Sequence, residues 1–332
     1  MTRGRVLLVC YHFPPVGGPA VGRPLALFKY LPRLGYHCDV LTVKPVAHRV
    51  WEPELLDGLD TSSVFRAGSH DPQRLMYLLG MRKMRDAFVH GGSPVSSRFF
   101  PDSQVGWIRP AIRLGRTLAS NRHYDVILST SPPVSNHLVA RQLSIELKAP
   151  WVADFRDFWT RLKAEDQYAK RRQIDKACSL LKSIRDQAAL VTAASPSIAA
   201  YVKADTVVYN SFDDDLVQLW QPPQTVNQFV IGILGTLNDI CPIRPLLELL
   251  AIMRQREPDL HERMRLVQVG RTDESWLLNQ LQEFDLADRC EVHLFQKREE
   301  TIRILSASAL LYLALGSETD SGVIPGRLYT LL

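Results

Sequence analysis

The feature of this chain that most constrains its fold is a repeated order of apolar strand, small-residue loop and helix. Arg5–Cys10 is a continuous apolar run, which is typical of a strand buried in a parallel sheet. A loop rich in proline and glycine follows, and then a helical segment over about residues 20–34. Since strands that alternate with helices form parallel sheets covered on both faces, this order predicts an α/β fold.

The order stops once and then starts again. Gln221–Thr225 is polar and rich in proline, as linkers are, and a new apolar strand is predicted at Phe229–Leu234. The sequence therefore predicts two Rossmann-like domains with parallel sheets facing a cleft, the first over residues 1–220 and the second over 221–332. The predicted strands are residues 5–10, 38–43, 125–130, 150–154, 190–192, 206–209, 229–234, 266–269, 292–295 and 309–314.

The pattern weakens between residues 44 and 103. Gln73–Phe88 is amphipathic, and the remainder of this stretch is interpreted as a loop or an insertion. In open α/β sheets, ligands bind beyond the carboxyl ends of the strands. The loops that follow the predicted strands are therefore where we expect the functional residues.

Composition bounds the compartment and the partners. The five cysteines lie far apart without a CxxC pair, which predicts free thiols and no zinc site. No apolar run approaches the roughly 20 residues of a membrane-spanning helix, and no signal peptide is evident. We expect a cytoplasmic protein, or one attached peripherally to the inner face of a membrane.

The charge is distributed unevenly. The net charge of +5 divides into +9 over residues 1–220 and −4 over residues 221–332. A basic first half favours an anionic partner, which is a phosphate-bearing substrate, an anionic membrane face or nucleic acid. The alternative is an ordinary solvated surface. Nucleic acid is the least favoured partner, because no basic and aromatic interleaving or known motif supports it.

The first candidate loop, Pro14–Gly18, follows the first predicted strand and precedes a helix. Gly17 and Gly18 would let backbone N–H groups approach a phosphate or a sugar, and the helix N-terminus adds positive potential. The loop is not a GxGxxG motif, and no acidic residue stands in the ribose-binding place about 20 positions on. The alternative is a tight turn that needs glycine.

Two further loops of the first domain carry polar side chains. His137 lies in the first turn of a predicted helix and would bond a substrate hydroxyl, or serve the structure alone. Asp154 and Asp157 follow a predicted strand and would orient acceptor hydroxyls, with Arg156 binding a phosphate or locking the carboxylates. The alternative there is a structural Arg–Asp pair at the edge of the sheet.

The second domain offers two small-residue turns that meet helix starts. The candidates for binding a nucleoside diphosphate there are Gly235, Thr236, Arg244, Gly322, Gly326 and Arg327. Arg244 would be the counter-charge at the first turn. At the second, backbone N–H groups, the helix dipole and Arg327 would hold a diphosphate leaving group.

Together these loops resemble the family-4 glycosyltransferases of GT-B fold, retaining enzymes that use nucleotide sugars. The resemblance rests on six motifs in the same order along the chain. They are Val6–Gly18, Ser129–Pro133 with His137, Ala153–Asp157, Tyr209–Asp213, Gly232–Leu237 and Gly322–Tyr329.

The resemblance implies that the first domain binds the acceptor and the second binds a nucleoside-diphosphate sugar as co-substrate. Gly17 and Gly18 would approach the donor phosphates or the transferred sugar, and Arg244 and Arg327 would neutralise the diphosphate, so that no metal or cofactor is needed. The acceptor would be a glycan or a lipid-linked glycan. The basic segment Arg82–Arg85 would lie on an anionic membrane, unless it is an ordinary surface helix.

The chain departs from the family pattern in two places. Thr330 stands where the family carries a glutamate that binds the ribose, and the chain ends inside a predicted helix where the family continues. These departures predict a truncated second domain and weakened donor binding. Two alternatives follow, a non-catalytic remnant with weak or no nucleotide binding, and a nucleotide-sugar epimerase, which shares the two-domain architecture.

Overall fold

The chain divides into two compact units, residues 1–210 and 211–332. The computed structural model describes residues 3–47, 50–79, 99–159, 171–221, 227–238, 241–294, 296–314, 322 and 324–331. The boundary lies before α8 (Asp214–Val217), because this helix packs on α12 (Arg298–Ser306) of the second unit. The sequence had placed it after residue 220.

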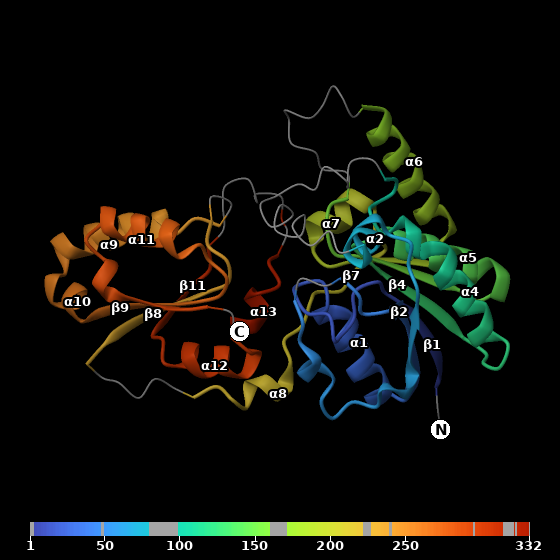
Figure 1. Ribbon diagram of the computed structural model, residues 1–332, viewed down its shortest axis with the longest axis horizontal. Helices are drawn as coiled ribbons and strands as arrows, with labels where there is room; N and C mark the ends of the chain where they lie inside the picture. Colours follow the sequence, from blue (N-terminus) through green and yellow to red (C-terminus); the bar gives the residue numbers. More distant parts are fainter. Residues whose placement is uncertain are drawn as a thin grey trace. The chain divides into compact units, whose positions relative to one another are not determined.

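The first unit contains a parallel sheet in the order β3-β2-β1-β4-β5-β6-β7 (Figure 1). Its strands are β1 Gly4–Val9, β2 Tyr36–Val43, β3 Val64–Ala67, β4 Val126–Ser131, β5 Trp151–Phe155, β6 Leu190–Ala193 and β7 Thr206–Val207. The chain runs outward from β1 to β3 and then returns to place β4 on the other side of β1. The order therefore reverses between β1 and β4, which is where ligands bind in open sheets of this kind.

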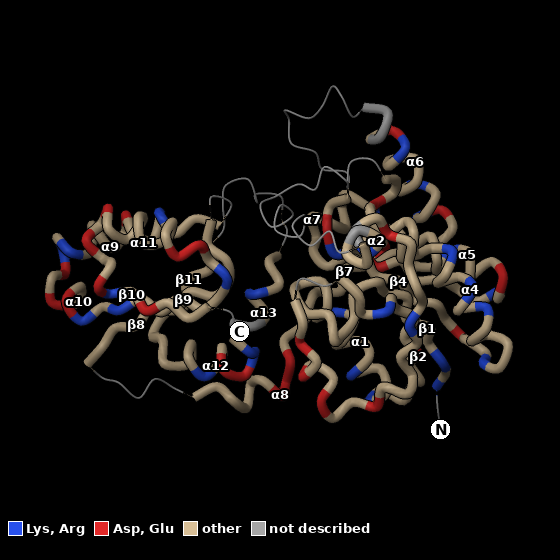
Figure 2. Tube along the Cα trace, viewed as in Figure 1, with Lys and Arg blue, Asp and Glu red and all other residues tan. Residues whose placement is uncertain are grey.

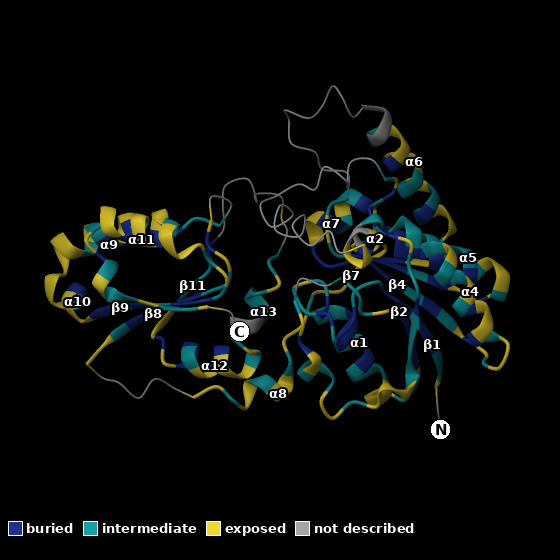
Figure 3. Ribbon diagram, viewed as in Figure 1, coloured by how far each residue is buried: buried dark blue, intermediate teal, exposed yellow. Residues whose placement is uncertain are grey.

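Helices cover both faces of this sheet. They are α1 Gly22–Arg33, α2 Pro72–Leu78, α4 Ile108–Ala119, α5 Ser135–Leu147, α6 Arg171–Gln187 and α7 Pro196–Val202. Successive side chains of β1 enter opposite cores, since Leu7 packs in the core that includes residues of α4 and α5 and Leu8 in the core that includes residues of α1. Because both faces are covered, the centre of the sheet is buried (Figure 3).

The second unit contains a smaller parallel sheet in the order β10-β9-β8-β11. Its strands are β8 Phe229–Leu234, β9 Met264–Val269, β10 Cys290–His293 and β11 Leu310–Tyr312. The helices of this unit, besides α8 and α12, are α9 Arg244–Arg256, α10 Pro258–Arg263, α11 Glu274–Glu283 and α13 Leu328–Leu331. A separate core joins β8, β9, α9 and α11, so each unit buries its own apolar side chains.

The predicted α/β class with two parallel sheets is confirmed. The interpretation of residues 44–103 as loop or insertion is wrong in one respect, because β3 (Val64–Ala67) pairs with β2 at the edge of the first sheet. Helix α2 covers the start of the predicted segment Gln73–Phe88, and residues 80–98 lie outside the described residues. Across the described residues, every helix is too short or too polar to cross a membrane.

Candidate functional site

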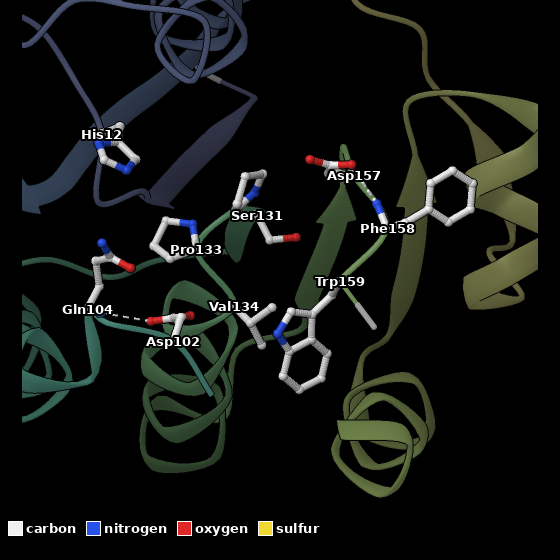
Figure 4. A pocket seen from close by; sticks show the side chains of 10 residues that line it. His12, Asp102, Gln104, Ser131, Pro133, Val134, Asp157, Phe158 and Trp159 are labelled. Atoms are coloured by element: carbon white, nitrogen blue, oxygen red, sulfur yellow. Dashed lines mark hydrogen bonds between the residues drawn. The ribbon is translucent and has the colours of Figure 1, made fainter. Parts of the chain in front are cut away.

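A pocket of about 210 Å³ lies in the first unit (Figure 4). His12 follows β1, Ser131 ends β4, and Asp157 follows β5, so the pocket lies at the carboxyl ends of three neighbouring strands. The lining residues are His12, Asp102, Gln104, Ser131, Pro132, Pro133, Val134, Asp157, Phe158 and Trp159. This place includes the reversal of strand order between β1 and β4, where the loops diverge and leave a crevice.

Arg156 holds one wall of the pocket through the backbone. Its guanidinium donates from Nε to the Ser131 carbonyl at 3.0 Å, from Nη1 to the Ala20 carbonyl at 2.8 Å and from Nη2 to the Pro132 carbonyl at 3.1 Å. Burial lowers the pKa of Arg156 below its ordinary value. The guanidinium thus ties the loop after β4 to the loop before α1 and does not itself line the pocket.

Asp154 lies behind this wall, at the end of β5. Its buried carboxylate accepts two hydrogen bonds from Arg23, at 2.9 and 2.7 Å, and one each from Thr130 at 2.7 Å and Thr192 at 2.6 Å. Burial by itself would raise the pKa of Asp154, but the Arg23 charge and these hydrogen bonds outweigh it, so its pKa is lowered. The partner of the predicted Asp154 is therefore Arg23, which the sequence did not indicate, rather than Arg156.

His137 is also buried behind the pocket. Its Nδ1 lies 2.8 Å from Ser129 Oγ, its ring packs on Phe155 at 4.5 Å between centroids, and its Nε2 has no hydrogen-bond partner among the described residues. Burial lowers the pKa of His137 to about 3. The ring is therefore neutral at physiological pH, and it is not among the side chains that line the pocket.

Asp157 is the one predicted polar residue of the first unit that lines the pocket. Its side chain reaches solvent, yet loss of surrounding water raises its pKa, against the opposing effects of the Phe158 N–H group and the Arg156 charge. Phe158 N donates to Asp157 Oδ1 at 2.8 Å, which fixes the carboxylate at the pocket. The second oxygen remains able to accept hydrogen bonds from a ligand.

The sequence did not indicate His12, Asp102 or Gln104 as pocket residues. Asp102 accepts from Ser135 N at 2.8 Å and from Gln104 N at 3.0 Å, so it joins the start of α5 to the loop that precedes α4. This loop lies in the stretch whose pattern is weak. His12 follows a clear strand, and its position there was the one available signal.

The amides of Gly17 and Gly18 are already hydrogen-bonded. Gly17 N donates to the Val50 carbonyl at 3.0 Å, and Gly18 N donates to the carboxylate of Glu52 at 2.9 Å. A Cβ atom on Gly17 would lie 1.8 Å from Glu52 Oε2, and Gly18 has a φ of +100°. The loop thus needs glycine for space and for conformation, and the carboxylate of the buried Glu52 fills the place where an external anion would meet the Gly18 amide.

In the second unit, the structure brings Gly235 and Arg327 together. Arg327 donates to the carbonyl of Leu234 at 3.1 Å and of Ala314 at 3.2 Å, and its Nη2 lies 2.9 Å from Cys241 Sγ. A Cβ atom on Gly235 would lie 2.7 Å from Arg327 Nη1. These contacts place the guanidinium at the carboxyl ends of β8 and β11.

The other candidates of the second unit lie in different surroundings. Arg244 begins α9, is exposed, and donates to both oxygens of Glu283 at 2.7 and 2.9 Å. Thr236 is exposed in the turn after Gly235. Gly322 has a positive φ, and Gly326 is exposed with open space around its Cα.

Comparisons with known proteins establish the type of fold. No protein-family model and no curated protein sequence matches the chain. Three solved structures do. They are sucrose-phosphate synthase from Thermosynechococcus elongatus (16% identity, TM-score 0.58, 96% of this chain and 79% of that chain), the catalytic domain of starch synthase IV from Arabidopsis thaliana bound to ADP and acarbose (14%, 0.60, 93% and 77%), and HepE from Anabaena in complex with UDP and glucose (14%, 0.55, 94% and 74%).

At these identities the likeness concerns the fold alone. The chain has the α/β fold of the GT-B type, built from Rossmann-like units with parallel sheets, as the sequence predicted. The solved structures that share it include several glycosyltransferases.

Proposed function

We propose that this chain is a retaining, family-4 glycosyltransferase that moves a sugar from a nucleoside-diphosphate sugar to an acceptor hydroxyl. The observation that carries the proposal is a fold shared over more than nine-tenths of the chain with structures that hold UDP or ADP. A strand-end site with a glycine turn and a guanidinium, as at Gly235 and Arg327, has the chemistry that a diphosphate requires.

In this proposal the second unit binds the donor and the first binds the acceptor. Arg327 and Arg244 would neutralise the diphosphate, and Gly235, Thr236, Gly322 and Gly326 would admit it close to the backbone. The acceptor would be a glycan or a lipid-linked glycan, bound at the pocket that contains Asp157. Contact with an anionic membrane would use Arg82–Arg85, a segment that lies outside the described residues.

A thermal-shift series with UDP, GDP and ADP tests the donor site. A ligand at 100 times its Kd stabilises a protein by about 2.7 kcal/mol, which gives a visible shift. A rise with one diphosphate supports the proposal and names the base. Cooperative melting without a rise for any of them overturns the proposal and favours the non-catalytic remnant.

Product analysis separates transfer from epimerisation. The chain is incubated with the selected nucleotide sugar, with and without a mixture of neutral oligosaccharides, and the products are identified by mass spectrometry and NMR. Transfer lengthens the oligosaccharide and keeps the anomeric configuration of the donor. A changed sugar in the absence of any acceptor would instead identify an epimerase.

A further inference from the structure

The pocket differs in charge from the unit that contains it. Lys and Arg residues of the first unit are spread over several elements and interleaved with acidic residues (Figure 2). Among the described residues that line the pocket, two are carboxylates, Asp102 and Asp157, and none is Lys or Arg. The nearby Arg156 directs its guanidinium to three backbone carbonyls. A phosphate in this pocket would therefore meet negative charge without a counter-charge.

The lining instead suits an uncharged ring with hydroxyl groups. Trp159 is held in place because its Nε1 donates to the Pro101 carbonyl at 3.3 Å and its indole packs beside Phe100. The indole and the rings of Pro132 and Pro133 offer apolar surface to the C–H face of a sugar. A few polar groups on a mainly apolar wall are typical of small-molecule sites.

Polar groups stand around that apolar surface (Figure 4). Asp157 has one oxygen bonded to the Phe158 amide, and its other oxygen can accept from a hydroxyl. His12, Gln104 and Ser131 add groups of the kinds that donate to and accept from hydroxyls. The volume of about 210 Å³ is below the range of about 300–1,000 Å³ found for drug-sized ligands, so it fits a single ring.

Resting on the proposed glycosyl transfer, we propose that this pocket binds one uncharged sugar residue of the acceptor, selects it through Asp157 and Trp159, and rejects a phosphorylated sugar. A lipid-linked or phosphorylated acceptor would then place its phosphate outside the pocket. Asp157 is thus a specificity-determining residue, because its carboxylate accepts from sugar hydroxyls and repels phosphate.

Saturation-transfer NMR and titration calorimetry on the full chain test this proposal. The probes are a panel of neutral methyl hexosides and the matching hexose 6-phosphates. We expect at least one neutral hexoside to bind and its 6-phosphate to bind at least about tenfold more weakly. Equal or tighter binding of the phosphates, or no binding of any neutral hexoside at millimolar concentration, would overturn the proposal.

Three variants localise the binding. Asp157→Asn should weaken the neutral hexoside by about tenfold or more, since a hydrogen bond to a charged acceptor is lost. Asp157→Lys should reverse the preference toward the 6-phosphate. Asp186→Asn, which changes an exposed carboxylate of α6 outside the pocket, should leave both affinities unchanged. Unchanged preference in Asp157→Lys would contradict the assignment.

Donor binding is measured in the same samples through stabilisation by the nucleoside diphosphate. If glycosyl transfer is the wrong function, that stabilisation is absent whatever the sugars do. If only the acceptor inference is wrong, the diphosphate still stabilises the wild type and Asp157→Asn equally, while neutral sugars do not bind. The two failures are therefore distinguishable.

Discussion

Arg23 and Asp154 form a buried pair that joins the first turn of α1 to the end of β5. The guanidinium donates to both carboxylate oxygens, and the two side chains are only 8% and 2% exposed. Arg23 also donates to the Tyr209 carbonyl at 2.9 Å, so the pair fixes a segment that follows β7 as well. The pair supports the pocket from behind, because the next residues after Asp154 lead into its wall.

Arg23→Ala should lower the free energy of unfolding by about 3–5 kcal/mol, because removing one partner leaves a buried carboxylate unpaired. Urea denaturation measures the change. The matched control is Arg116→Ala, whose bidentate pair with Glu146 is 58% and 25% exposed and should cost at most about 1 kcal/mol. Equal losses in the two variants would contradict the structural role given to Arg23.

His137 predicts a dependence of stability on pH. Its pKa is about 3 in the folded chain and 6.5 in the reference state, so the unfolded chain binds the proton first as the pH falls. The contribution is fully present above about pH 6.5 and is lost progressively toward pH 3. Between pH 7 and pH 5, linkage gives a loss of about 2 kcal/mol in the free energy of unfolding.

Urea unfolding at pH 7 and pH 5 checks this value. The His137→Gln variant should lose that part of the pH dependence, because the glutamine side chain does not titrate. His123→Gln is the control, since His123 is 84% exposed and should leave the slope unchanged. An unchanged slope in His137→Gln would show that the ring takes up its proton in the folded chain.

The sequence predicted the two parallel sheets because continuous apolar runs such as Val6–Val9 mark strands covered on both faces. The short edge strand Val64–Ala67 contains Arg66 and lacks such a run, so its pairing with β2 was not predictable. Local pattern also does not show which side chain meets which. Arg23 and Asp154 are 131 residues apart, and only the sheet topology brings them together.

The same limit applies to the pocket. Asp154 and Asp157 both follow β5 with the same side-chain chemistry, yet one is buried against Arg23 and the other reaches the pocket. The alternation of a strand turns neighbouring residues to opposite sides, and a loop after it does so without a fixed period. Position at a strand end was predictable, while the direction of each side chain required the structure.

Gly17→Ala should destabilise the loop after β1. The added Cβ atom would lie 1.8 Å from Glu52 Oε2 and 2.7 Å from Val50 Cγ1, so the 50–52 segment must shift. We expect a loss of about 1–3 kcal/mol, as for other overpacked sites, in urea denaturation. Gly22→Ala is the control, because nothing lies within 4 Å of its Cβ position and alanine favours a helix. A Gly17→Ala variant as stable as Gly22→Ala would show that Glu52 does not pack there.

Arg327 and Arg244 differ in a way that makes the donor site testable. Arg327 is held by the carbonyls of Leu234 and Ala314, whereas Arg244 is exposed and paired with Glu283. A guanidinium fixed at the strand ends needs little reorganisation to bind a diphosphate, and its remaining N–H donors can reach the phosphate oxygens. Arg327→Gln should therefore weaken the nucleoside diphosphate by about 10- to 100-fold, the value of a charge-assisted hydrogen bond.

Calorimetry with the diphosphate selected by thermal shift measures that loss. Arg327→Lys keeps the charge but not the fork, so it should recover only part of the affinity. Arg244→Gln should have a smaller effect than Arg327→Gln, because leaving Glu283 is a cost that diphosphate binding must offset. If Arg244→Gln removes binding and Arg327→Gln does not, the diphosphate lies at the start of α9, and Arg327 serves only to join β8 to the segment after β11.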